Sequence, residues 1–246
     1  MTKIAEAYSD ENKKARGGKR GDQTGREIRV TDWYKRDGGW EVYLECTDPL
    51  LAEAAAYNAE MIAQDDKFGY NQSDRWSGYD AIVAGGSIDE AEVGDFDCSS
   101  HVLASYILAG LKAKPEGYTG NLERILLETG KFKAYRDSAH LNSAALARKG
   151  GIYLTPKAHV LMVLEDGGGI VEAVQTVLQP QVPTPTTGKR VYAKGSVKVR
   201  TAPIDGAKIT TLQKGESLPY VGVWYVVELN GERAFISANK KYTEVK

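Results

Sequence analysis

Apolar residues in the first part of the chain recur at helical spacing, and each run begins at a capping residue. The run LLAEAAAYNAEMIAQ follows Asp48 and Pro49, which are typical of an N-cap and a first helical position, and it predicts a helix. A second helix is predicted over residues 98–111, with Asp97 as its cap. A third is predicted over residues 121–130, where a final glycine is the stop signal.

Beyond residue 150 the pattern changes to short apolar runs that are typical of β-strands. Three strands are predicted, over residues 151–154, 159–164 and 170–178. The last two are separated by the turn sequence EDGGG, so we expect them to form a hairpin. Helices followed by an antiparallel sheet predict an α+β domain.

The end of the chain has a different pattern. The segment QPQVPTPTTG holds three of the eight prolines and no charge, and it predicts an extended linker over residues 179–189. The linker would separate a larger domain, residues 1–178, from a smaller one, residues 190–246. In the smaller domain, alternating segments such as SVKVRTAP and YVVELNGERAFIS are split by turns, which predicts a small all-β barrel.

Composition excludes several classes of protein. Lys+Arg 32 against Asp+Glu 33 gives a net charge of −1, so we expect no nucleic-acid partner. No run reaches the roughly 18 apolar residues of a membrane helix, and we expect no membrane insertion. The N-terminal MTKIAEAYSDENKK has no apolar segment of a signal peptide, so we expect synthesis in the cytoplasm.

Two cysteines are too few for a disulfide framework or a cysteine-rich zinc site. The acidic segment IDEAEVGDFD does not have the spacing of an EF-hand loop. We therefore expect no metal site and no cofactor.

Cys98 opens a predicted helix, where unpaired backbone N–H groups and the helix dipole favour the thiolate. A cysteine nucleophile also needs a histidine partner that the fold brings close. His159 opens an apolar strand and is the favoured base, whereas His101 is interpreted as a packing residue and His140 as a surface residue. The alternative for Cys98 is that it is a small buried apolar residue, as a lone cysteine often is. For Cys46 we adopt this packing role.

The residue that would orient His159 depends on the register of the predicted hairpin. A turn at residues 165–166 places Glu172 opposite His159. A turn centred on Gly167 places Gln175 there instead, so both remain candidates.

These motifs resemble a known family. Asp97-Cys98-Ser99-Ser100 at a helix start, His159 at a strand start and a polar residue one strand later resemble the NlpC-type cell-wall cysteine peptidases, whose papain-like fold includes the CHAP amidohydrolases. The segments RGGKRGDQTGREIRVTDWY, FGYNQSDR, TGNLERILLETGKF and HVLMVLEDGGGIVEA resemble a phage or prophage subgroup, so the resemblance covers about residues 1–173. The tail is similar to bacterial SH3-like cell-wall-binding domains.

The resemblance implies a papain-like α+β fold, with bacterial peptidoglycan as the partner and substrate. The residues that it assigns to catalysis are Cys98, His159 and Glu172, and those that it assigns to substrate binding are Tyr70, Asp97 and Ser99. The SH3-like domain would raise the local concentration of the enzyme at the wall.

The function expected on this basis is that of an endolysin-like hydrolase that cuts an amide bond of the wall peptide. The bond is expected to be the D-glutamyl–diamino-acid bond, and the N-acetylmuramoyl-L-alanine bond is the alternative. A non-catalytic wall-binding or phage tail structural protein is the alternative of another class. Such an enzyme would reach the wall after holin-type release or as part of a virion.

Overall fold

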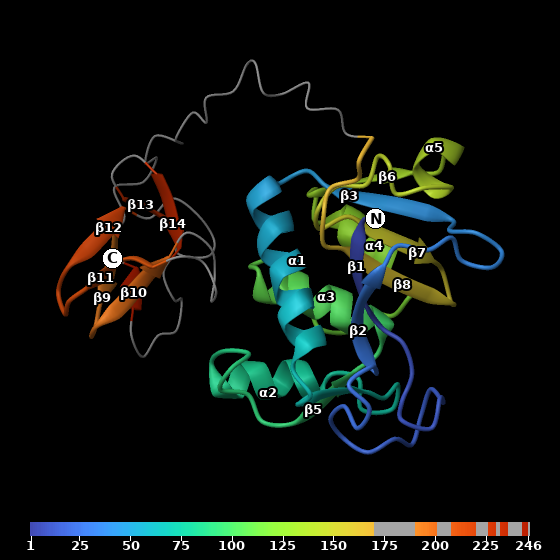
Figure 1. The fold of residues 1–246 in the computed structure, drawn as a ribbon, viewed down its shortest axis with the longest axis horizontal. Coiled ribbons are helices and arrows are strands. Elements are labelled where there is room, and N and C mark those ends of the chain that lie inside the picture. Colours follow the sequence, from blue (N-terminus) through green and yellow to red (C-terminus); the bar gives the residue numbers. More distant parts are fainter. Residues whose placement is uncertain (170–189, 201–207, 220–225, 230–231, 236–242, 246) are drawn as a thin grey trace. The chain divides into compact units, whose positions relative to one another are not determined.

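The structure is a computed structural model that describes residues 1–169, 190–200, 208–219, 226–229, 232–235 and 243–245 (Figure 1). The chain divides into two compact units, Met1–Val171 and Glu172–Lys246. The predicted strand 170–178 and the predicted linker 179–189 lie outside the described residues.

A six-stranded antiparallel sheet forms the centre of the first unit, in the order β2-β1-β8-β7-β3-β6. Its strands are β1 (Lys3–Ala7), β2 (Ile28–Asp32), β3 (Val42–Cys46), β6 (Phe132–Tyr135), β7 (Ile152–Thr155) and β8 (His159–Val163). The first strand of the chain therefore lies inside the sheet, directly beside β8. The α+β prediction is confirmed.

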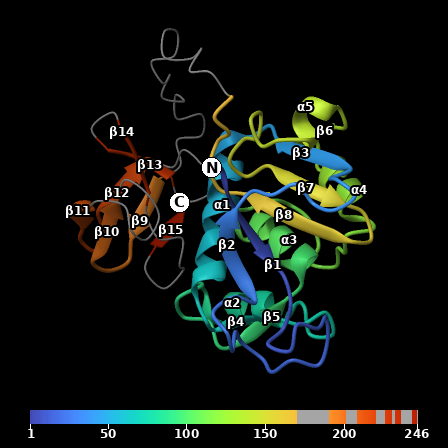
Figure 2. The ribbon, with the colours of Figure 1, turned by 45° about the vertical axis from the view of Figure 1, so that its right-hand side comes forward.

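Two helices, α1 (Pro49–Gln64) and α3 (Cys98–Leu108), lie side by side on one face of this sheet, as Figures 1 and 2 both show. The side of α1 that is buried is rich in alanine, with Ala52, Ala55, Ala56 and Ala59 at most 5% exposed. Small side chains allow two helices to approach closely, so this face of α1 suits a tightly packed neighbour.

The three helices predicted from the sequence are confirmed, the first over its whole predicted run and the other two with shorter ends. Asp48 accepts a hydrogen bond from the Leu51 N–H at the start of α1, as its capping role requires. The third predicted helix is α4 (Leu122–Glu128). Two helices were not predicted, α2 (Ser77–Gly85) and the short α5 (Ser138–Leu141).

A second, two-stranded sheet leads the chain into α3. It pairs β4 (Phe68–Tyr70) with β5 (Gly94–Phe96) in parallel, and α2 packs against β5. A Cβ on Gly94 would lie 2.5 Å from the Gly78 backbone, so only glycine permits this approach of helix and strand. This contact fixes β5, and with it the start of α3.

Apolar side chains cover both faces of the six-stranded sheet. On the helical side, Ile62, Phe68, Phe96 and Ala104 belong to one core cluster. On the other side, a second cluster joins strand residues to the segment after α5; it contains Ile4, Trp40, Tyr43, Ala144, Ala147, Tyr153, Leu161 and Val163. The sheet is thus buried on both faces.

The strand that begins at His159 has neighbours other than the predicted one. β8 pairs with β7 through a tight turn in which Thr155 lies opposite His159, and with β1 along its other edge. Lys157, within the turn, has a left-handed backbone with φ of 62°. The hairpin that positions His159 is therefore β7–β8, and the strand beyond it in the sheet is β1.

The described part of the second unit is all β-structure, as predicted. Four strands form one sheet in the order β11-β10-β14-β13, and three form another in the order β12-β9-β15. The strands are β9 (Arg190–Ala193), β10 (Val197–Arg200), β11 (Lys208–Leu212), β12 (Ser217–Pro219), β13 (Val226–Leu229), β14 (Glu232–Phe235) and β15 (Thr243–Val245). The described strands form these two sheets rather than one closed barrel, and the SH3-like assignment stays a prediction.

Candidate active site

The start of α3 is built around the Asp97 carboxylate. Its Oδ1 accepts hydrogen bonds from the Ser100 N–H at 2.7 Å and from the Ser99 hydroxyl at 2.8 Å. The Ser100 hydroxyl in turn accepts the Asp97 N–H at 2.8 Å, which completes a capping box. The predicted cap is confirmed, and it fixes the backbone on which Cys98 stands.

Cys98 is the first residue of α3 and is only 5% exposed. Its sulfur interacts with the backbone N–H groups of Ser99, of Cys98 itself and of Val160 on β8. The thiol therefore lies at the beginning of β8, beside the residue that follows His159. Helix α3 packs against β8, so residues far apart in the sequence, Cys98 and Val160, lie close to each other.

Burial raises the pKa of the Cys98 thiol to about 12; the neighbouring Asp97 carboxylate also raises it, whereas the backbone N–H groups lower it. This differs from the thiolate that we expected from the helix start alone. Desolvation outweighs the helix N-terminus here, because the charged form has lost its water. The resting thiol is neutral and needs a base.

His159 is held on three sides. Its ring stacks at 30° on Trp40, with the ring centroids 6.2 Å apart, and meets the edge of Tyr8 at the same centroid distance. Its Nε2 lies 2.7 Å from the Glu6 carboxylate on β1. An ionised carboxylate can only accept, so Nε2 donates its proton, and in the neutral imidazole the lone pair is then on Nδ1.

The Glu6 side chain is fully buried and is the centre of a polar cluster. The Arg29 guanidinium donates to its Oε1 from Nε at 2.9 Å and from Nη2 at 2.7 Å, and the Tyr34 hydroxyl donates to its Oε2 at 2.7 Å. Burial alone would raise the pKa of Glu6. The bonds from His159, Tyr34 and Arg29 outweigh burial and hold the pKa below its usual value.

Sequence reasoning missed Glu6. The predicted third residue, Glu172, and its alternative, Gln175, both lie outside the described residues, and the carboxylate that the structure places on His159 is Glu6. The available signal was a charged residue within the short apolar run IAEA, since a buried charge needs partners.

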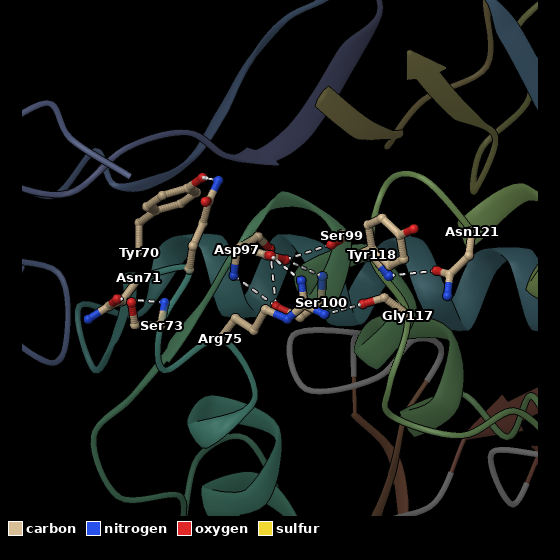
Figure 3. A network of polar contacts seen from close by, with 11 residues as sticks. Tyr70, Asn71, Ser73, Arg75, Asp97, Ser99, Ser100, Gly117, Tyr118 and Asn121 are labelled. Carbon is tan, nitrogen blue, oxygen red and sulfur yellow. Dashed lines mark hydrogen bonds and ion pairs between the residues drawn. The ribbon is translucent and has the colours of Figure 1, made fainter. Parts of the chain in front are cut away.

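Tyr70, predicted to bind substrate, ends the strand β4, which pairs with the strand that leads into α3. The parallel pairing of β4 and β5 sets Tyr70 opposite Phe96, just before the cap of α3. Burial raises the pKa of the Tyr70 hydroxyl, and a Cys98 thiolate would raise it further. The Tyr70 oxygen accepts a bond from the Gln72 side chain at 3.2 Å (Figure 3).

Asp97 and Ser99, also predicted to bind substrate, are bonded within the protein. Ser99 is fully buried and Asp97 is 4% exposed. The second carboxylate oxygen of Asp97 accepts the Arg75 guanidinium at 3.0 Å, as Figure 3 shows. Their described contacts build the start of α3, and substrate contact by either residue stays a prediction.

The other histidines and the second cysteine have other surroundings. His101 is fully buried, its Nε2 lies 3.0 Å from the Ala59 carbonyl oxygen, and burial lowers its pKa to about 4. His140 stacks between Tyr43 and Tyr135 and bonds to a carboxylate, so it is a packed residue rather than the predicted surface residue. Cys46 is buried with a free thiol, in line with the packing role predicted for it.

Within the described residues, no group of three or more His, Cys, Asp or Glu side chains is arranged to hold a metal ion. None of the helices in the described ranges combines the length and apolar character needed to cross a membrane.

Comparison with known protein families gives the class of this protein. The family model of the endolysin-like domain matches residues 4–170. The chain belongs to the endolysin-like domain family, which makes it a phage endolysin-type enzyme of the bacterial cell wall. Neither a curated protein nor a solved structure matches the chain significantly.

Membership in this family supports three expectations drawn from the sequence, in their general form. The general role is that of a peptidoglycan hydrolase, the partner is peptidoglycan, and the place of action is the cell wall.

Proposed function

We propose that this endolysin-like domain is a cysteine hydrolase that cuts an amide bond of the wall peptide, with Cys98 as nucleophile, His159 as base and Glu6 as the orienting residue. The observation that supports the proposal is the packing of α3 on β8, which places Cys98 near the Val160 N–H, directly after a histidine whose Nε2 is bonded to a buried carboxylate. In this proposal Glu6 has the orienting role that was predicted for Glu172.

The first step is proton transfer from the thiol. Because the Cys98 thiol is neutral, His159 removes its proton through the free Nδ1 as the sulfur attacks the amide carbonyl carbon. The buried Glu6 carboxylate stabilises the imidazolium that forms. The backbone N–H groups at the start of α3 are the candidate donors to the oxyanion.

The second step releases the amine. The imidazolium of His159 gives its proton to the leaving nitrogen, the C–N bond breaks, and a thioester to Cys98 remains. Water, deprotonated by His159, then attacks the thioester and releases a carboxylic acid with regeneration of the thiol. Tyr70, whose hydroxyl pKa a Cys98 thiolate would raise, is the candidate substrate contact at this point.

The bond that we propose is the D-glutamyl–diamino-acid bond, which makes the enzyme an endopeptidase. Cleavage at the N-acetylmuramoyl-L-alanine bond by the same residues would make it an amidase. Mass spectrometry of digested walls distinguishes the two, because the first creates a new amino terminus on the diamino acid and the second one on alanine.

The assignment of the base is tested by replacing two histidines separately. His159→Ala is expected to slow the release of wall fragments about 100- to 10,000-fold, the usual contribution of a general base. His101→Ala should affect folding stability more than the catalytic step, since His101 is fully buried away from any described carboxylate bond. Folded fractions are compared by circular dichroism before rates are measured. Loss of activity in folded His101→Ala, with His159→Ala fully active, would overturn the assignment.

The second unit is proposed to hold the enzyme at the wall. A chain shortened to residues 1–182 is expected to bind purified walls more weakly in a sedimentation assay, because a second binding contact raises the effective concentration. Its rate on soluble wall fragments should stay that of the full chain. Equal sedimentation of both chains would contradict a targeting role.

A further inference from the structure

The charge of Asp97 lies next to the thiol, and the thiolate form of Cys98 is disfavoured by it. The start of α3 nevertheless needs the Asp97 side chain, because its Oδ1 accepts hydrogen bonds from the Ser99 hydroxyl and the Ser100 N–H. An aspartate at this position therefore improves the helix start and at the same time opposes the formation of a negative sulfur.

Arg75 is the counterion of this aspartate. Its Nη1 donates to Asp97 Oδ2 at 3.0 Å, and its Nη2 donates to the Gly117 carbonyl at 3.0 Å, as Figure 3 shows. The Asp97 side chain is 6% exposed and the Arg75 side chain 26%. A pair this poorly hydrated is screened less than a surface pair, so its charge acts on neighbouring groups.

Arg75 also lines an open cavity of about 680 Å³, together with Gln72 and Trp76. Gln72 is the residue that donates to the Tyr70 hydroxyl. The lining of this cavity does not include Cys98, Asp97 or Tyr70, so the bonds of Arg75 to Asp97 and Gly117, and not the cavity, place it in the site.

We propose that Arg75 is a positioning residue of the hydrolase, which neutralises the Asp97 carboxylate and so makes the Cys98 thiolate accessible during attack. This inference rests on the cysteine mechanism proposed above. Arg75 acts through Asp97 rather than on the substrate, and its second bond, to Gly117, holds the guanidinium in place.

The other charged and ionisable groups around α3 do not replace this role. They are Tyr70 on β4, Asp95 on β5, His101 on α3, His159 on β8 and Glu6 on β1. Asp95 accepts the Gly21 N–H, and Glu6 carries the bonds from His159, Arg29 and Tyr34. Among the described residues, Arg75 is the cation that is bonded to the carboxylate beside the thiol.

The test measures the thiol directly. Iodoacetamide alkylation of Cys98, followed by mass spectrometry of the Cys98 peptide between pH 6 and 10, reports the thiolate fraction without any hydrolysis. In Arg75→Ala, the alkylation rate at a given pH is expected to fall about tenfold, which corresponds to a rise of about one unit in the thiol pKa. Arg75→Lys should restore most of the rate, and Arg124→Ala, which removes an exposed helical ion pair, should leave it unchanged.

Asp97→Asn supplies the second half of the test. Asparagine still caps a helix, and without the carboxylate the alkylation rate should rise above that of the wild type. In this background Arg75→Ala should no longer change the rate, as in a double-mutant cycle between coupled residues. If Arg75→Ala lowers the alkylation rate of Cys98 equally in the wild type and in Asp97→Asn, the proposal is wrong.

Hydrolysis gives an independent comparison. Raising the pH by about one unit should recover much of the wall activity that Arg75→Ala loses, because more thiolate forms. A loss that is independent of pH would show a merely structural role for Arg75. Unaltered wall cleavage in Cys98→Ala would instead refute the cysteine mechanism itself, so the two failures are distinguishable.

Discussion

Cys98→Ala is expected to reduce the release of wall fragments by at least about 10,000-fold, because the thioester that divides hydrolysis into two steps can no longer form. The variant should keep its fold, since alanine fits a site that is already buried and is a good helix former. Purified walls are digested with equal amounts of both proteins, and the soluble fragments are quantified by mass spectrometry.

Cys46→Ala is the matched control for this experiment. Cys46 is the second buried free thiol of the chain, and its sulfur contacts the Asp48 carbonyl rather than a histidine-bearing strand. We expect full hydrolysis from this variant. Unreduced cleavage by Cys98→Ala, or loss of cleavage in both variants although both are folded, would contradict the proposed nucleophile.

Glu6→Ala is expected to combine a loss of activity with a loss of stability. Without the carboxylate, His159 Nε2 has no acceptor, and the rate of wall cleavage should fall about 100- to 10,000-fold. Removal of the carboxylate leaves the Arg29 guanidinium, whose side chain is 33% exposed, without its charged acceptor and should cost about 1–3 kcal/mol in the free energy of unfolding. Urea denaturation measures the second effect, and Glu53→Ala on the exposed side of α1 is the control.

The orienting role of Glu6 has a signature that stability alone would not produce. ¹⁵N chemical shifts of the His159 ring should show the proton on Nε2 in the wild type and a mixture of tautomers in Glu6→Gln at neutral pH. If the tautomer is the same in both proteins, Glu6 supports the fold without orienting the base.

Glu6 also makes stability depend on pH in a defined direction. Its pKa in the folded protein lies below the usual 4.5, so the folded state binds its proton less readily than the unfolded state. The stabilisation is complete above pH 4.5 and is lost as the pH falls through the lower folded-state pKa. The difference in unfolding free energy between wild type and Glu6→Gln should therefore shrink in acid.

Local chemistry explains why the start of α3 could be predicted. Asp97, Ser99 and Ser100 are within four residues of one another, and a cap needs nothing beyond such neighbours. The same holds for α1, with Asp48 and Pro49 at its start. The protonation of Cys98 was not predictable in this way, since desolvation depends on strands that arrive from elsewhere in the chain.

The sheet was harder to predict, because strand partners are chosen by long-range packing. The run KIAEA has two alanines and a buried glutamate, which give little strand signal, yet as β1 it lies between β2 and β8. Adjacent strands in the sequence were expected to pair, and this led to Glu172 and Gln175 as neighbours of His159. The described neighbours are β7 and β1, and the latter supplies Glu6.

The position of Glu6 in the first strand has a consequence for biosynthesis. Glu6 and His159 are separated by 153 positions, so the bond between them closes almost the entire first unit into one loop. Contacts of such high sequence separation form late in folding. During translation Cys98, the proposed nucleophile, leaves the ribosome before His159, the proposed base, has been made. The proposed catalytic residues can therefore come together only when the first unit has been synthesised and folded.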